Sequence, residues 1–181
     1  MLNRYVALLR GINVGGNNIV PMKELKAVFE SHGCQEVSTY INSGNVFFSS
    51  SIGDRITLQT SIQALLKQHF GLDLALAVLT CAEIADALAH APDWWGRAPE
   101  VKHNAIFVIP PVSADRVLAE VGPHKPDYEK VGAYGQVIFW SAPLLTFSRT
   151  RWSKIVGTKA YDWVTIRNAN TFRKIVELCK G

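Results

Sequence analysis

The chain has 181 residues, of which 48% are hydrophobic, 10% aromatic and 19% charged. This composition excludes a disordered, collagen-like or fibrous protein, and the length suits one mid-sized domain or two small ones. Nineteen Lys and Arg residues against fifteen Asp and Glu give a net charge of +4, an excess that permits an anionic partner without requiring one.

The cysteines and histidines predict neither a disulfide framework nor a metal site. Cys34, Cys81 and Cys179 are odd in number and far apart, and they form no Cys-x-x-Cys motif. The five histidines form no pair at metal-ligand spacing. No apolar run reaches the roughly 18 residues of a membrane span, and the first residues do not resemble a signal peptide. We therefore expect a protein of the reducing cytoplasm with no membrane partner.

The first half of the chain predicts the order βαββαβ. The apolar run at residues 6–9 is typical of a strand buried on both faces, and Leu58, Ile62 and Leu66 recur at helical spacing. Pro21 suits the first turn of a helix, and Gly33 suits a helix end. We predict strands at 6–9, 37–41, 46–48 and 74–78, and helices at 21–33 and 55–70.

The second half repeats this order less clearly, after an alanine-rich helix at 82–91 and a connecting segment at 92–99. Ser113 predicts the N-cap of a helix, and residues 152–157 predict a later helix that ends at Gly157. The other predicted elements are strands at 105–109, 128–131, 137–140 and 164–167, a turn at 132–135 and a final helix containing 172–179.

These elements predict an α+β protein of two ferredoxin-like βαββαβ halves with antiparallel sheets and a C-terminal helix. A single mixed α/β sheet is the alternative. We place the first half at residues 1–80, a helical connector at 81–102 and the second half at 103–181. In a βαββαβ unit the chain leaves its first two strands at the same end of the sheet, so the loops at 10–18 and 42–45 should be neighbours.

The two loops are the first candidate site. Gly11 and Gly16 have the spacing of a phosphate-binding loop, but Asn17 and Asn18 stand where Lys and Ser or Thr would be needed. A small anionic or polar ligand could bind backbone N–H groups there, or the glycines could only serve a long turn. The predicted ligand-binding residues are Arg10, Gly11, Asn13, Gly15, Gly16, Asn42, Ser43, Gly44 and Asn45.

A basic cluster in the last third is a second candidate site for an anion. Cations near a hydroxyl-capped helix start favour phosphate or carboxylate, although a solvated basic face has the same pattern. The predicted residues are Arg149, Arg151, Ser153, Lys154, Arg167 and Asn168. Trp94 and Trp95 could stack on a ring, but two such residues in a connector more often fill the seam between domains. We expect Phe47 and Phe48 to be core residues.

The segments at 9–16, 22–25 and 39–46 together resemble one mostly bacterial family, called domain of unknown function 1697. The segments at 153–157, 165–168 and 170–171 resemble its C-terminal motif, with Ala169 standing where the family often has an aromatic residue. The resemblance implies two ferredoxin-like halves. It implies no established activity, and therefore no catalytic residue and no cofactor.

Three functions remain open at this point. The first is binding of a small anionic ligand, such as a phosphorylated metabolite or a nucleotide, at the Gly- and Asn-rich loops. The second is a nucleic-acid-binding module that uses the basic C-terminal third. The third is a protein-interaction module without chemistry, for which an exposed apolar patch should mark the interface. Neither a reaction nor the oligomeric state follows from the sequence.

Overall fold

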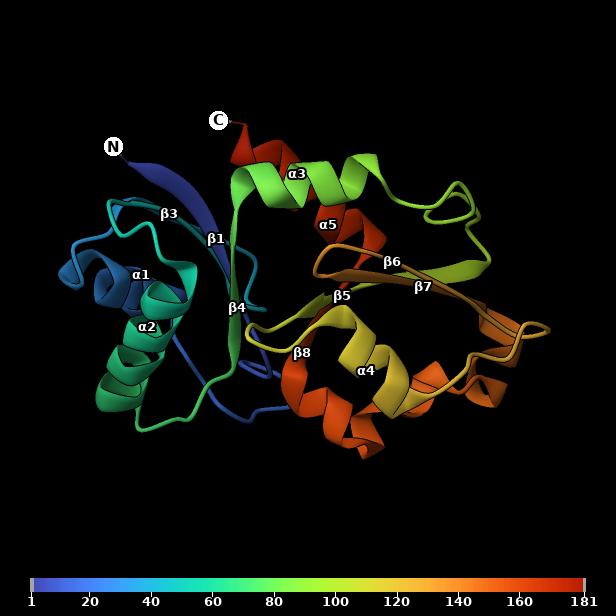
Figure 1. Cartoon of the computed structure of the whole chain (residues 1–181). Coiled ribbons are helices and arrows are strands. Elements are labelled where there is room, and N and C mark those ends of the chain that lie inside the picture. Colours follow the sequence, from blue (N-terminus) through green and yellow to red (C-terminus); the bar gives the residue numbers. More distant parts are fainter. Residues whose placement is uncertain (1, 181) are drawn as a thin grey trace. The chain divides into compact units, whose positions relative to one another are not determined.

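The computed structural model describes residues 2–180 and contains two four-stranded antiparallel sheets with helices packed on them (Figure 1). The α+β class is therefore confirmed. The chain divides into two compact units. The first comprises the residues up to Ala85 together with those from Ile175 on, and the second is Asp86–Lys174. In both units the order of strands is consistent with a ferredoxin-like half.

In the first unit the sheet order is β2-β3-β1-β4. Its helices α1 and α2 cover one face of this sheet (Figure 1). The elements are β1 (Asn3–Leu9), α1 (Met22–Ser31), β2 (Gln35–Tyr40), β3 (Asn45–Ser50), α2 (Arg55–Phe70) and β4 (Leu76–Thr80). The predicted helix at 55–70 is confirmed at both ends. Asp54 caps its first turn by accepting a hydrogen bond from the Thr57 N–H at 3.0 Å, and Gly71 ends it with a φ of 68°.

The first core lies between that sheet face and the two helices. Alternate residues of β1 point into it, and Phe48 stacks on Tyr5 with ring centroids 5.6 Å apart. Phe47 and Phe48 are both buried, which confirms them as core residues.

The second unit has the sheet order β6-β7-β5-β8. Its elements are β5 (Val101–Val108), α4 (Ala114–Val121), β6 (Lys130–Tyr134), β7 (Val137–Pro143) and β8 (Val164–Asn168), with three 3-10 helices between β7 and β8: η1 (Leu144–Arg149), η2 (Trp152–Gly157) and η3 (Lys159–Trp163). The predicted Ser113 cap is confirmed, since its Oγ accepts a hydrogen bond from the Arg116 N–H at 3.3 Å.

One local prediction in the second unit, the turn at 132–135, is wrong. Residues 132–134 belong to strand β6, and the turn follows at Gly135, which has a φ of 55°. A Cβ on Gly132 would lie 3.2 Å from a side-chain carbon of Pro92. Glycine at this position therefore lets Pro92 pack closely against strand β6. The predicted helix at residues 152–157 is confirmed and is a 3-10 helix. Trp152 and Ile155 are both buried because a spacing of three residues puts them on one face of such a helix.

Helices α3 (Cys81–Ala89) and α5 (Ala169–Cys179) each extend across the boundary between the units. Thr80 and Glu83 form a capping box at the start of α3. The Glu83 carboxylate accepts hydrogen bonds from the Thr80 N–H at 2.8 Å and from its hydroxyl at 2.9 Å, and the Thr80 hydroxyl accepts one from the Glu83 N–H at 3.1 Å. Cys81 directly follows Thr80, so this cap fixes its position at the start of α3.

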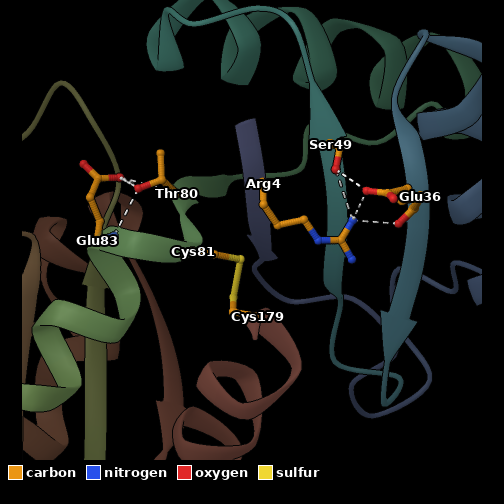
Figure 2. The surroundings of a disulfide bond; sticks show 7 residues. All are labelled: Arg4, Glu36, Ser49, Thr80, Cys81, Glu83 and Cys179. Carbon is orange, nitrogen blue, oxygen red and sulfur yellow. Dashed lines mark hydrogen bonds and ion pairs between the residues drawn. A yellow bond between two sulfur atoms is a disulfide. The ribbon is translucent and has the colours of Figure 1, made fainter. Parts of the chain in front are cut away.

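Cys81 forms a disulfide with Cys179, both in the first unit (Figure 2). The expectation of no disulfide was wrong because the partners are separated by 98 residues in sequence, and only the fold brings their Cα atoms to 5.3 Å. Cys34 is free and buried, and burial raises the pKa of its thiol to about 11. Among the described residues, no helix is long and apolar enough to cross a membrane.

Candidate functional site

The two Gly- and Asn-rich loops of the first unit lie side by side, as predicted. The Nδ2 of Asn13 donates hydrogen bonds to the backbone oxygens of Val20 and Asn42, both at 2.9 Å. The Leu9 N–H also donates to the Gly44 oxygen at 2.8 Å. The fold therefore brings together the predicted residues of both loops, although they are about thirty positions apart.

The glycines of the first loop form a tight turn. The Asn17 N–H donates to the Val14 oxygen at 3.0 Å, and Gly15 and Gly16 between them have φ values of 58° and 78°. Two consecutive positive φ angles are those of a type I′ turn, which requires glycine or Asn at these positions. Conformation alone is therefore a sufficient reason for both glycines, and ligand binding at this loop stays a prediction.

The second loop uses its polar and glycine residues to hold its own shape. Asn45 is fully buried, and its Nδ2 donates to the Tyr40 oxygen at 2.9 Å and to the Ser43 hydroxyl at 3.2 Å. A Cβ on Gly44 would lie only 2.8 Å from side-chain atoms of Leu9 and Ile12. These residues are thus part of the packing at the end of the first sheet.

The basic cluster of the second unit already holds an internal anion. The buried carboxylate of Glu129 accepts hydrogen bonds from the backbone N–H groups of Arg151 at 2.8 Å, Trp152 at 3.2 Å and Lys125 at 3.0 Å. The indole N–H of Trp140 donates to it as well, at 3.0 Å. The backbone donors that the sequence offered to a ligand here are bound to the protein itself. The side chains of Arg149, Arg151 and Lys154 remain exposed.

The predicted residues Arg167 and Asn168 have different surroundings from the rest of that cluster. Arg167 is buried, and its guanidinium donates to the Thr165 hydroxyl and to the Ile166 oxygen, both at 2.9 Å. Burial lowers the pKa of this guanidinium to about 10. Asn168 caps α5, because its Oδ1 accepts the Thr171 N–H at 2.8 Å.

The start of α5 opens onto a cavity of about 650 Å³, which we call the cationic cavity. Of the described residues twelve line it, and none of these is Asp or Glu. The lining residues are Gly96, Arg97, Ala98, Pro99, Val101, Lys102, His103, Leu144, Asn168, Ala169, Asn170 and Arg173. Three permanent cations and the start of a helix therefore belong to this lining, and these features favour negative charge, although the Lys102 ammonium also lies 4.4 Å from the centroid of the Phe147 ring, outside the lining.

Arg173 is held in place on the wall of the cationic cavity. Its guanidinium donates to the Gly96 oxygen at 2.7 Å and lies 5.6 Å from the centroid of a Trp95 ring. Gly96 has a φ of 78°, and a Cβ at this position would overlap the guanidinium. Trp95 is buried, and it packs edge-on against Phe139 and Phe172.

His103 lies at the edge of the cationic cavity and is hydrogen-bonded on both ring nitrogens. Nε2 contacts the Ala98 oxygen at 3.2 Å, closer than its 3.4 Å contact with the Ala98 N–H. Because a carbonyl only accepts, the shorter contact assigns the ring hydrogen to Nε2, and Nδ1 accepts from the Ser141 hydroxyl at 2.5 Å. Desolvation is the largest effect on the pKa of His103 and lowers it; the hydrogen bond to Ala98 opposes this shift, and the charge of Arg173 adds to it.

A second cavity of about 270 Å³, which we call the aromatic cavity, shares Ala98, Val101 and His103 with the first. The rings of Trp94 and Tyr128 belong to its lining. The remaining residues that line it are Pro126, Asp127, Glu129, Lys130, Ser141 and Pro143. The two cavities thus differ in chemistry while sharing one wall.

Comparison with known proteins identifies the family. The sequence matches the family described as Protein of unknown function (DUF1697) over residues 2–139. The chain belongs to the DUF1697 family. A solved structure described as the conserved bacterial protein SP0830 from Streptococcus pneumoniae is 32% identical, with 99% of each chain covered and a TM-score of 0.87. No match was found among curated proteins.

Sequence reasoning missed most of the cavity residues of this DUF1697 protein. Asn168 was predicted, and Arg173 belongs to the basic C-terminal third, but Arg97, Lys102 and Asn170 were not assigned to a site. They come from the connector, β5 and α5, and no contiguous motif joins them. The available signal was the positive charge near residue 97 and at the start of the last helix. Among the described residues, no group of three or more His, Cys, Asp or Glu could hold a metal ion.

Proposed function

We propose that this DUF1697 protein binds a small anionic ligand, and that the cationic cavity of its second unit is the binding site. The observation that carries the proposal is the lining, which combines Arg97, Lys102 and Arg173 with the N-terminus of α5 and has no carboxylate among its described residues. A phosphate-bearing metabolite is the class of ligand that such a set of donors suits.

The charges of the cavity are available to a ligand. Arg173 presents a fork of five donors and uses a neutral carbonyl as its partner, so its positive charge is not compensated by that bond. Arg97 lies 3.5 Å from Asp93, but both side chains are exposed, and exposed ion pairs contribute only about 0–1 kcal/mol. The cavity volume of about 650 Å³ falls in the range of small-molecule sites.

Isothermal titration calorimetry with inorganic phosphate and pyrophosphate tests the proposal. Arg173→Gln should weaken binding about ten- to a hundredfold, because it removes a charged donor worth about 1.5–3 kcal/mol. Arg116→Gln is the matched control: Arg116 also stacks on a ring, 4.8 Å from the centroid of Trp163, but it does not line the cavity. Equal affinities of the two variants, or no binding by the wild type, would contradict the proposal.

Nucleic-acid binding is a second candidate function, favoured by the exposed side chains of Arg149, Arg151 and Lys154. This alternative predicts affinity for oligonucleotides that falls steeply with salt, because bound counterions are released. Arg151→Gln would weaken that binding and leave phosphate binding unchanged. The loops of the first unit stay a third place at which a polar ligand could bind.

We also propose the cytoplasm as the compartment, on the sequence prediction that no signal peptide and no membrane span is present. The Cys81–Cys179 disulfide favours the opposite, since disulfides are rare in the cytosol. Fractionation of the producing cell, with thiols blocked at lysis, measures both the location and the state of the pair.

A further inference from the structure

The aromatic cavity has a chemistry that the binding of phosphate alone does not use. Its lining includes the rings of Trp94 and Tyr128 together with Pro126 and Pro143, all of which offer flat apolar surfaces. Aromatic side chains of this kind stack on planar rings, and every nucleobase has such a face. At about 270 Å³ the cavity suits one ring system, because sites for whole ligands usually have at least about 300 Å³.

The aromatic cavity has hydrogen-bond acceptors in its lining beside the cation of Lys130. The Ser141 hydroxyl donates its hydrogen to His103, so its oxygen is left to accept from a ligand. Asp127 is exposed and adds a carboxylate to the lining. A ring that carries an amino group or a ring N–H would satisfy both. Two carboxylates, Asp127 and Glu129, stand against one cation, Lys130, in this lining, so it favours a phosphate less than the cationic cavity next to it does.

The two cavities are adjacent, because Ala98, Val101 and His103 line both. His103 holds this shared wall together through its bonds to Ala98 on one side and Ser141 on the other. In the sheet register His103 pairs with Ser141 of β7, and Ser141 pairs with Lys130 of β6. Residues that pair directly in an antiparallel sheet have side chains on the same face, so one row of side chains lies along the aromatic cavity.

We propose that the ligand of this protein is a phosphorylated ring compound of the nucleotide class, which fills both cavities at once. Its phosphate lies in the cationic cavity near Arg173, and its amino-bearing ring stacks in the aromatic cavity against Trp94. This inference rests on the proposed function, since it takes the anion site as given and adds the class of molecule that carries the anion.

Calorimetric titration of the wild-type protein with three probes tests the inference. The probes are inorganic phosphate, adenosine and adenosine 5′-monophosphate. We expect the nucleotide to bind at least tenfold more tightly than either of the other two, because only the nucleotide occupies both cavities. This comparison needs no variant, so it decides the matter even if a substitution prevents folding.

Substitutions at Trp94 test whether the ring of the ligand binds in the aromatic cavity. Trp94→Leu should weaken nucleotide binding about tenfold and leave phosphate binding unchanged, and unchanged phosphate binding also shows that the variant is folded. Trp94→Phe keeps an aromatic face and should restore most of the nucleotide affinity. Arg173→Gln should weaken both phosphate and nucleotide.

The outcomes separate the two proposals. If phosphate binds and the nucleotide binds no more tightly, the inference fails and the anion site stands. If adenosine binds as tightly as the nucleotide, the two-cavity ligand is wrong. If neither phosphate nor the nucleotide binds, the proposed function and the inference fall together. Equal losses of phosphate and nucleotide binding in Trp94→Leu would place the ring elsewhere and overturn the assignment.

Discussion

The two units have equivalent sheets but use their polar residues differently. In the first unit, the conspicuous Asn and Gly residues are bonded to the backbone of their own loops, as when Asn13 links Val20 and Asn42. In the second unit, Arg173 and His103 also have internal partners, yet both line a cavity. A dense motif can therefore report the needs of a turn, whereas a site can be assembled from scattered side chains.

The units also differ in how they are closed. The first has a 16-residue helix, α2, between its third and fourth strands, and a disulfide. The second has three short 3-10 helices at the equivalent place. All five tryptophans of the chain lie in the second unit, so intrinsic fluorescence reports on this unit alone: Trp94, Trp95, Trp140, Trp152 and Trp163. This asymmetry provides a probe for testing the units separately.

Removal of the disulfide should have the largest effect and should act on the first unit. Cys179→Ser is expected to lower the free energy of unfolding by about 2–4 kcal/mol, because the link joins residues separated by 98 positions. Urea unfolding followed by circular dichroism should then begin before the change in tryptophan fluorescence. Reductant should shift the wild type toward the variant and leave the variant unchanged. Identical wild-type curves with and without reductant would contradict this prediction.

Gly44→Ala should have the next largest effect on the first unit. Gly44 has a φ of 82°, and its new Cβ would lie 2.8 Å from atoms of Leu9 and Ile12. Strain and overpacking together should cost about 2–4 kcal/mol of unfolding free energy, measured in urea. Gly15→Ala is the matched control, because its φ of 58° is similar and no atom lies within 4 Å of its Cβ. It should cost about 1–2 kcal/mol, and a loss as large as that of Gly44→Ala would show that crowding has no part.

Gly96→Ala should separate binding from folding in the second unit. The added Cβ displaces the Arg173 guanidinium, so phosphate affinity should fall about three- to tenfold in a calorimetric titration. Gly135→Ala also places a side chain at a positive φ, 55°, but in open space away from the cavity. If both variants bind phosphate equally well, then the position of Arg173 does not matter for the ligand.

The smallest expected effect is on pH dependence through His103. The pKa of this ring is below 6.5 in the folded protein, so the unfolded chain binds the proton more tightly. The stabilisation is present above pH 6.5 and is lost as the pH falls through the window between 6.5 and the folded value. Unfolding free energies at about pH 7.5 and about pH 5.5 should therefore differ more for the wild type than for His103→Gln. If the unfolding free energy changes equally between the two pH values in the wild type and in His103→Gln, then the His103 ring is not desolvated.

The elements of the fold were predictable because their signals are local. The bounds of α2 follow from Asp54, the apolar spacing and Gly71, all within one stretch of chain. The adjacency of the two loops followed from topology alone. The 3-10 type of the helix at 152–157 was not predictable, since Trp152 and Ile155 satisfy the spacing of either helix type.

The cavities and the disulfide were beyond sequence reasoning for a different reason. Arg173 meets Gly96 across 77 positions, and Cys81 meets Cys179 across 98. Nothing in the spacing of such residues records a contact. The basic cluster shows the converse: its residues suggested a site for an external anion, but the backbone donors there bind Glu129, which a local pattern does not reveal.

The division of α5 between the units has a consequence for biosynthesis. Residues up to Lys174 belong to the second unit, and those from Ile175 on belong to the first. A ribosome therefore synthesises the whole second unit before it adds the segment of the first unit that begins at Ile175. Until then the nascent first unit lacks the buried side chains of Ile175 and Val176, and Cys81 has no partner. The disulfide can form only after translation has passed Cys179, so it marks a chain whose synthesis has reached that point.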